Sequence, residues 1–177
     1  MTTWTKPTDI TQTPELEDHI QWQRGADNFD LNREAGIIQS SKPLLYISND
    51  GHAPLRMKTW YIHFTGFQFE NLPDTISGLE LKTSIRRKGR IVDDTVQLRH
   101  NGDFIGENKI NHRTDDLGHL PINNVTSYGG FDDLWGAELT KSLLLDPTFG
   151  VTLRLQSHLF YPHRETVLID SVELRVY

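Results

Sequence analysis

The feature that most constrains the fold of this chain is a β-hairpin signal near its middle. Asn101 and Gly102 are a pair typical of a two-residue type I′ turn, which needs positive φ angles at both central positions. Asparagine tolerates such an angle, and glycine adopts it without steric cost. Val96 and Leu98 precede the turn with the two-residue period of a half-buried strand, and apolar residues return at Phe104. The stretch therefore predicts an antiparallel β framework.

Alternating apolar and polar residues predict further strands on both sides of this hairpin. Turn signals separate them at intervals of roughly 10 to 15 residues, and no long amphipathic helix is evident. Two of these strands, 79–86 and 149–156, are expected to have one face in water. About seven or eight such strands predict an all-β protein, a single antiparallel β-sandwich of jelly-roll type. The strand candidates outside the hairpin are 44–48, 58–69, 79–86, 149–156 and 167–177.

Local departures from this pattern predict where strands bend or end. Gly66 is expected to mark a bulge, and the apolar parity slips near Asp170. Residues 128–136, YGGFDDLWG, suit a tight connection plugged by aromatic side chains. Residues 139–145 suit a helical turn.

The first 42 residues differ from the rest of the chain in their pattern of apolar and polar residues. Residues 1–42 are poor in periodicity and are predicted to form a mostly irregular N-terminal arm, and residues 43–177 form the β-sandwich domain. Two placements of the arm stay open: it reaches a neighbouring molecule, or it lies across its own sandwich. Its apolar side chains are the predicted partner-binding residues, namely Trp4, Ile10, Leu16, Ile20 and Trp22.

Composition excludes several classes of protein. The 177 residues include no cysteine, which excludes disulfides, thiolate zinc sites and thiol nucleophiles. A formal net charge of −6 argues against a nucleic-acid partner. No apolar run approaches the roughly 20 residues that span a bilayer, so no membrane partner is expected. The first residues lack the pattern of a secretory signal, which predicts synthesis and retention in the cytoplasm.

No motif predicts catalysis, a cofactor or a metal site. The sequence lacks HExxH, GxSxG, a P-loop and GxGxxG. His112 and His119 lie in a polar loop beside Asp115 and Asp116, where a solvated loop is preferred over a metal site. The pairs at 93–94 and 132–133 suit either a structural Ca²⁺ or ordinary turns, and turns are preferred.

Two sequence features can be interpreted either as binding sites or as ordinary parts of the structure. The basic stretch 85–91, IRRKGRI, suits an acidic partner, but a solvated strand end is preferred. The aromatic residues between 60 and 69 could stack on a sugar, but alternation already assigns most of them to the core.

Several of these segments together resemble a β-sandwich domain of structural proteins in tailed bacteriophages and prophages. The similarity covers 76–177 and includes VDDTVQLRHNGDFIGENK, YGGFDDLWG and LIDSVELRVY; WTKPTDI at the start is similar more weakly. The resemblance implies a virion location but does not separate capsid from tail. It implies structural signature residues, and none that is catalytic: Asp94, Thr95, Val96, Gly129, Gly130, Asp133, Leu134, Trp135 and Gly136, to which the turn adds Asn101 and Gly102.

The function expected from this resemblance is that of a non-enzymatic virion structural protein, made in the host cytoplasm. Its partners would be other virion proteins, such as the major capsid or tail proteins, and further copies of itself. A capsid decoration or cement protein is preferred, because a small sandwich with a polar arm suits clamping of neighbouring subunits. A tail, neck or baseplate component is the first alternative. A carbohydrate-binding or host-receptor-binding module is the second, and a glycoside-cleaving enzyme would need two facing carboxylates in a cleft.

Overall fold

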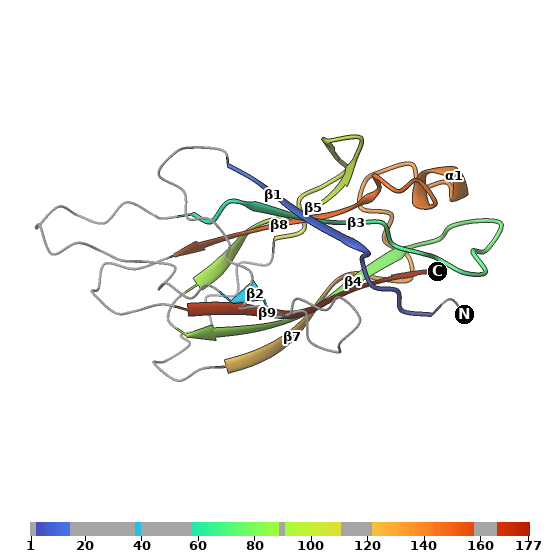
Figure 1. Ribbon diagram of the computed structural model, residues 1–177. Helices are drawn as coiled ribbons and strands as arrows, with labels where there is room; N and C mark the ends of the chain where they lie inside the picture. Colours follow the sequence, from blue (N-terminus) through green and yellow to red (C-terminus); the bar gives the residue numbers. More distant parts are fainter. Residues whose placement is uncertain (1–2, 15–37, 40–57, 89–90, 111–121, 158–165) are drawn as a thin grey trace, which may run out of the picture.

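The computed structural model consists of two antiparallel β-sheets, which confirms the all-β prediction (Figure 1). It describes residues 3–14, 38–39, 58–88, 91–110, 122–157 and 166–177. The five-stranded sheet has the spatial order β1 (Asp9–Thr13), β3 (Tyr61–Thr65), β8 (Gly150–Ser157), β5 (Ile91–His100) and β6 (Asp103–Ile105). The four-stranded sheet has the order β2 (Ile38–Gln39), β9 (Thr166–Val176), β4 (Leu79–Lys88) and β7 (Ile122–Gly129).

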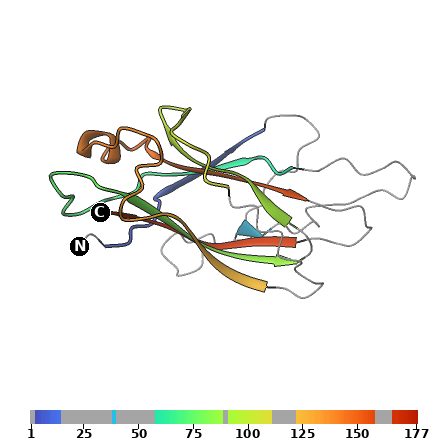
Figure 2. The same ribbon diagram turned by 180° about the vertical axis from the view of Figure 1, so that it is seen from behind.

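The strands after β1 pair as a nested set. β5 pairs with β6, β4 with β7, β3 with β8, and β2 with β9, so that the chain folds back on itself around the β5–β6 turn. Two further pairings, β5 with β8 and β4 with β9, join these ladders into two sheets. The views from front and back show the sheets as two layers, with the chain crossing repeatedly between them (Figures 1 and 2). Most contacts that define the fold therefore join residues that lie far apart in the sequence.

The turn at the centre of this nesting has the predicted geometry. Asn101 has a φ of 51° and Gly102 a φ of 91°, and His100 pairs with Asp103 across them. Positive angles at both central positions define the type I′ turn, whose twist matches that of its strands. The hairpin prediction is confirmed.

The core lies between the sheets and is built from the alternate apolar positions of both. β4 behaves as predicted: Leu79, Leu81, Thr83 and Ile85 are buried, and the residues between them are partly exposed. The largest fully buried side chains of the described residues are Trp135, Phe64, Phe149, Ile62, Leu79, Leu81, Ile85, Leu98, Leu144, Leu153 and Leu155.

The prediction that 149–156 has one face in water is wrong. β8 is the central strand of its sheet, flanked by β3 and β5, and Thr152 and Arg154 on its outer face are buried along with the core residues. Side chains from the flanking strands cover this face. Alternation in the sequence shows which residues share a face, but not whether neighbours cover it.

The predicted irregularities are partly confirmed. The parity slip near Asp170 is a bulge, because Ser84 pairs with Ser171 while Ile85 pairs with Ile169. Gly66 is not a bulge within a strand: β3 ends at Thr65. The predicted helical turn is α1 (Lys141–Leu144), whose first turn is capped by Thr140. No helix in the described ranges is long and apolar enough to cross a membrane.

The start of the predicted arm lies on the two-sheet body. Thr5 forms a bridge with Leu174 in the four-stranded sheet, and the chain then continues into β1 at the edge of the five-stranded sheet. Ile10 is buried in the core. Trp4 lies over β4 and β9, with the Lys82 ammonium 4.2 Å and the Arg175 guanidinium 4.5 Å from its ring centre.

Residues 3–14 therefore connect the two sheets, and they are not part of an irregular arm. The short polar strand β1 was missed because Ile10 is its only large apolar residue. The arm anchors Leu16, Ile20 and Trp22, and the predicted strand 44–48, lie outside the described residues.

If residues 3–14 belong to the body, Ile10→Ala should lower the free energy of unfolding by about 2 kcal/mol or more, because it leaves a cavity in the core. Thr11→Ala, at the exposed neighbouring position, should change it by no more than about 0.5 kcal/mol. Denaturant unfolding of both variants measures the difference. Equal unfolding midpoints would show that β1 contributes nothing to stability.

Candidate functional site: the outer face of the five-stranded sheet

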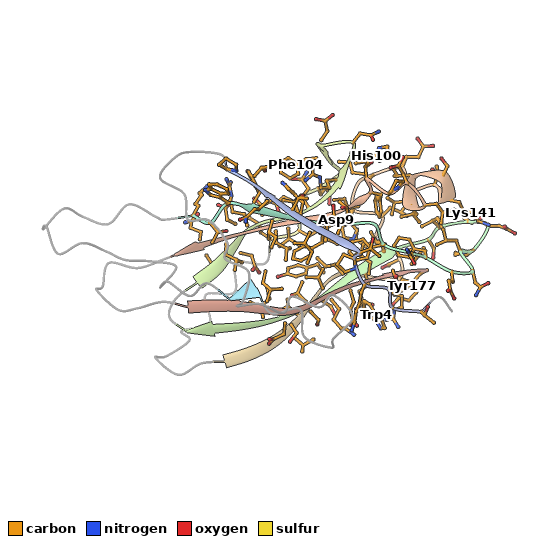
Figure 3. All side chains as sticks on the ribbon, in the orientation of Figure 1. Trp4, Asp9, His100, Phe104, Lys141 and Tyr177 are labelled. Carbon is orange, nitrogen blue, oxygen red and sulfur yellow. The ribbon has the colours of Figure 1, made fainter. Side chains whose placement is uncertain are left out.

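The outer face of the five-stranded sheet gathers polar, ionisable and aromatic side chains. In β3, Ile62 and Phe64 point into the core, so Tyr61 and His63 lie on the opposite face. The same alternation in β8 places Arg154 there, between β3 and β5. Figure 3 shows the described side chains extending from this sheet away from the core.

His63 joins three strands through its ring. One ring nitrogen, Nε2, lies 2.8 Å from the Thr13 hydroxyl on β1, and Nδ1 lies 2.8 Å from the Thr152 hydroxyl on β8. Burial, together with the nearby Arg99 guanidinium, lowers the pKa of His63 from 6.5 to about 4. The ring is therefore neutral at physiological pH, and it holds the edge strand β1 to the middle of the sheet.

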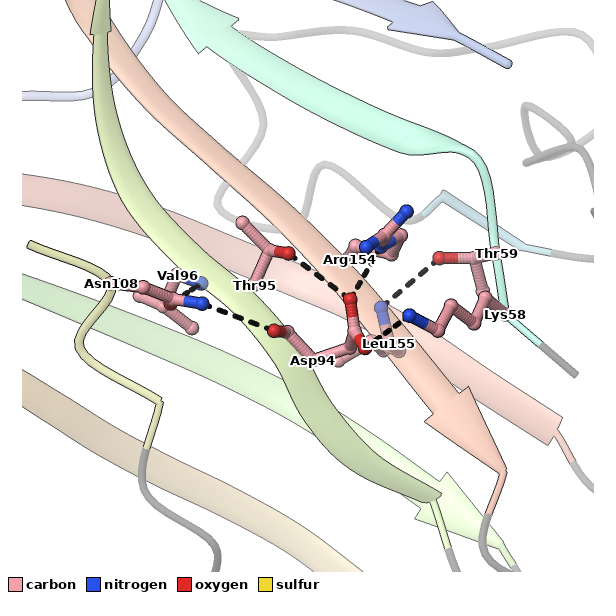
Figure 4. Close-up of polar contacts among 8 residues, drawn as sticks. All are labelled: Lys58, Thr59, Asp94, Thr95, Val96, Asn108, Arg154 and Leu155. Carbon is pink, nitrogen blue, oxygen red and sulfur yellow. Dashed lines mark hydrogen bonds and ion pairs between the residues drawn. The ribbon is translucent and has the colours of Figure 1, made fainter. Parts of the chain in front are cut away.

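Asp94 is the centre of an ion-pair network on the same face (Figure 4). Its carboxylate accepts a hydrogen bond of 2.5 Å from Arg154 Nε and lies 2.9 Å from Lys58 Nζ. The Thr95 hydroxyl donates to it as well, at 3.1 Å. The Arg154 guanidinium also lies 4.1 Å from the centre of the Tyr61 ring, a cation–π contact. One carboxylate thus pairs with two cations, Arg154 of β8 and Lys58 of the segment that precedes β3.

A bulge explains how Asp94 reaches this face. Asp93 pairs with Leu155 and Thr95 pairs with Arg154, which leaves Asp94 as the extra residue of β5. The shift allows both Asp93 and Val96 to face the core. There, Asp93 accepts a 2.6 Å hydrogen bond from the Tyr128 hydroxyl of the other sheet. The prediction that residues 93–94 form a turn is wrong, since both lie inside a ten-residue strand.

Phe104 is the exposed apolar group of this face. It lies at the edge strand β6, 45% exposed, with its ring edge-on to Tyr61 at a centroid distance of 5.4 Å. Burial, followed by the charge of Asp94, raises the pKa of Tyr61, so its hydroxyl stays protonated at neutral pH. The two rings offer an apolar surface beside a patch of charges.

Residues 130–136 form a tight connection, as predicted, and are hereafter called the connector. Tyr128 and Gly129, which were predicted to belong to it, are the last residues of β7. Trp135 is fully buried with a φ of 59°, and its indole Nε1 donates to the Leu79 carbonyl at 2.8 Å. Its backbone N–H donates to Asp133, and the Asp133 carbonyl accepts from the Leu79 N–H at 2.9 Å. The Trp135 carbonyl accepts from the Glu107 N–H at 2.6 Å. The connector therefore joins the start of β4 to the segment that follows β6.

That segment also holds the bulge in β5. The Asn108 amide accepts from the Val96 N–H at 2.8 Å and donates to the Asp94 carbonyl at 3.2 Å (Figure 4). The Lys109 N–H donates to the Val96 carbonyl, and Lys109 Nζ lies 3.0 Å from the Asp133 carboxylate. A side-chain amide thus takes the place of a partner strand on the β6 side of β5, beyond the end of β6 at Ile105.

The structure brings most predicted signature residues into one network. Residues 106–109 contact both the β5 bulge and the connector, so the two sequence motifs meet on a single segment. Leu134 differs, because its side chain is exposed. The residues placed around this network are Asp94, Thr95, Val96, Gly129, Gly130, Asp133, Trp135 and Gly136; the turn residues Asn101 and Gly102 lie at the far end of β5.

The described residues contain no group of three or more His, Asp or Glu side chains arranged to hold a metal ion. The loop with His112, Asp115, Asp116 and His119 lies outside the described residues. The side chains at 86–91 do as well, so the basic stretch is not placed.

Sequence reasoning missed the residues that organise this face: His63, Asn108, Lys109 and Arg154. Each gains its role from a partner at least ten residues away in the sequence, and no local motif marks it. Comparison with protein-family models, with curated proteins and with solved structures finds no match.

Two neighbouring glycines allow a sharp test of the connector. Gly129 has a φ of 74°, and a Cβ there would lie 2.3 Å from both the Leu79 carbonyl oxygen and Trp135 Nε1. Gly129→Ala should therefore destabilise the protein by about 2 kcal/mol or more. Gly130→Ala is the matched control, because a Cβ there meets nothing within 4 Å. Similar melting temperatures for the two variants would contradict the described packing of Trp135.

His63 predicts a pH dependence of stability. Its pKa is about 4 in the folded state and near 6.5 when unfolded, so the unfolded state binds more protons between these values. Stability should fall as the pH drops from about 6.5 to about 4, and His63→Gln should flatten that part of the profile. Urea unfolding of both proteins at several pH values measures it. If the free energy of unfolding changes equally with pH in the wild type and in His63→Gln between about pH 4 and 6.5, His63 is excluded as the cause.

Proposed function

We propose that this chain is a non-enzymatic structural protein of a bacteriophage virion, with a jelly-roll β-sandwich that binds other virion proteins and further copies of itself. The observation that carries the proposal is the role of the residues that resemble phage structural proteins. Most of these residues take part in packing, in a strand bulge or in a turn. A motif of this kind maintains a scaffold, which is what a virion component needs.

The strand pairing supports the jelly-roll assignment. The eight strands β2 to β9 pair first with last through the whole set, as a long hairpin does when it rolls into two sheets. Jelly rolls are common in viral capsid and lectin domains. The fold alone does not select a function, so the proposal also depends on the resemblance.

A capsid decoration or cement role is the preferred form of the proposal. The chain would be made in the host cytoplasm and assembled into the virion, with major capsid or tail proteins as its partners. A tail, neck or baseplate location is the alternative. The N-terminal attachment would use Leu16, Ile20 and Trp22, because Trp4 and Ile10 already contact the chain's own sheets. We propose no catalytic residue, cofactor, nucleic acid or membrane contact.

Binding to particles tests this proposal. The purified chain should co-sediment with particles that lack it, because apolar anchors contribute roughly 1.5 to 3 kcal/mol each when fully buried on a neighbour. A variant with Leu16, Ile20 and Trp22 all changed to serine should bind much less. The control is Leu145→Ser, at an exposed position on the body. Failure of the full chain to bind would overturn the cement role, and equal binding by the triple variant would place attachment on the sandwich.

A carbohydrate-binding module is the second candidate, favoured by the outer face of the five-stranded sheet. Phe104 and Tyr61 lie beside Arg154 and Asp94, and sugar recognition combines aromatic surfaces with polar groups of this kind. If this candidate is right, the chain should bind host-surface glycans, and Phe104→Ala should abolish binding. Phe131→Ala is the control, since Phe131 is 68% exposed but lies in the connector. If Phe104→Ala and Phe131→Ala both keep glycan binding, or both lose it, the outer face is excluded as the glycan-binding site.

A further inference from the structure

Among the described residues, the border of the four-stranded sheet at β7 is an open pairing edge. β7 pairs with β4 over all eight of its residues without a register shift, and no other strand of the described ranges pairs with its second side. In Figure 1 it forms the outer border of its layer. Alternate residues of an edge strand direct N–H and C=O groups outward, where another strand can bind them.

The other three sheet borders in the described ranges are protected. β2 has two residues and β6 has three, which is too short to template a partner. β1 has five, and it carries Asp9 at its start. Natural proteins use short edge strands, charged side chains and bulges to prevent association at edges. β7 has none of these devices in its sequence, INNVTSYG.

The charge distribution favours a second copy of the chain as the partner. The chain has a formal net charge of −6, so two copies repel each other over most approaches. β7 is the only strand longer than two residues in the described set with no Asp, Glu, Lys, Arg or His. Two copies can therefore meet along β7 without placing like charges opposite each other.

One large apolar side chain is exposed on the same border. Val125, near the middle of β7, is 64% exposed, although a β-branched side chain on a sheet is favoured by contact with neighbours. A strand that pairs antiparallel with its own copy about a two-fold axis is self-complementary, since each contact occurs twice. Pairing would place Val125 against residues of the partner strand.

We propose that β7 pairs antiparallel with β7 of a second copy, so that two four-stranded sheets become one continuous sheet across a dimer. This inference gives a location to the self-association within the proposed function, and it does not depend on virion membership. A dimer could form whether or not the protein attaches to particles.

Sedimentation equilibrium of the full chain, from micromolar to near-millimolar concentration, tests the dimer. The wild type should approach twice its chain mass of 20.4 kDa. Val125→Lys should weaken self-association by roughly tenfold or more, because lysines at an edge oppose pairing. The matched control is Leu145→Lys, at an apolar residue that is 58% exposed on the other sheet's side of the molecule, beside α1; it should dimerise like the wild type.

A second measurement locates the interface without mutation. Amide hydrogen exchange in residues 122–129 should slow as the wild-type concentration rises, because pairing protects the outward N–H groups. A wild type that stays monomeric would overturn the inference, as would a dimer equally sensitive to Val125→Lys and Leu145→Lys. A dimer whose β7 exchange is independent of concentration would overturn it too. None of these outcomes bears on co-sedimentation with particles, so the two proposals can fail separately.

Discussion

The buried indole of Trp135 is the contact on which the ends of both sheets depend. Its N–H donates to the Leu79 carbonyl at the start of β4, which also accepts from the Gly130 N–H, and its own backbone binds the segment after β6. A buried indole N–H without this acceptor would cost about 1 to 3 kcal/mol, so the hydrogen bond fixes where the ring can lie. The neighbouring Gly129 is required because the ring and the β4 backbone leave no room for a Cβ.

The need to pair polar groups also explains the bulge at Asp94. An extra residue in β5 lets an acidic side chain face each side of the sheet: Asp93 binds Tyr128 in the core and Asp94 neutralises Arg154 outside. Removing Asp94 would take the counter-ion away from the buried Arg154 guanidinium, which is strongly unfavourable. Both motifs therefore stabilise the scaffold.

Some features of the fold and of the outer face could be predicted from the sequence, and others could not. The Asn101–Gly102 turn follows from local conformational preference. The buried positions of β4 and the bulge near Asp170 follow from the periodicity of apolar residues. The burial of Thr152 and Arg154 depends on strands 50 or more residues away, which alternation does not report. β1 has only one large apolar residue, so its place in the sheet depends on pairing with β3 and on His63. The site on the outer face was missed for the same reason.

The central claim, that the chain is a structural component of a virion, is tested most directly by its position in a reconstructed particle. The account predicts density for the two-sheet body at contacts between neighbouring virion subunits, with Trp135 buried inside the body and exposed surfaces of the body at the contacts. Particles purified from the source, complete and infectious, with no density or peptide from this chain would contradict it.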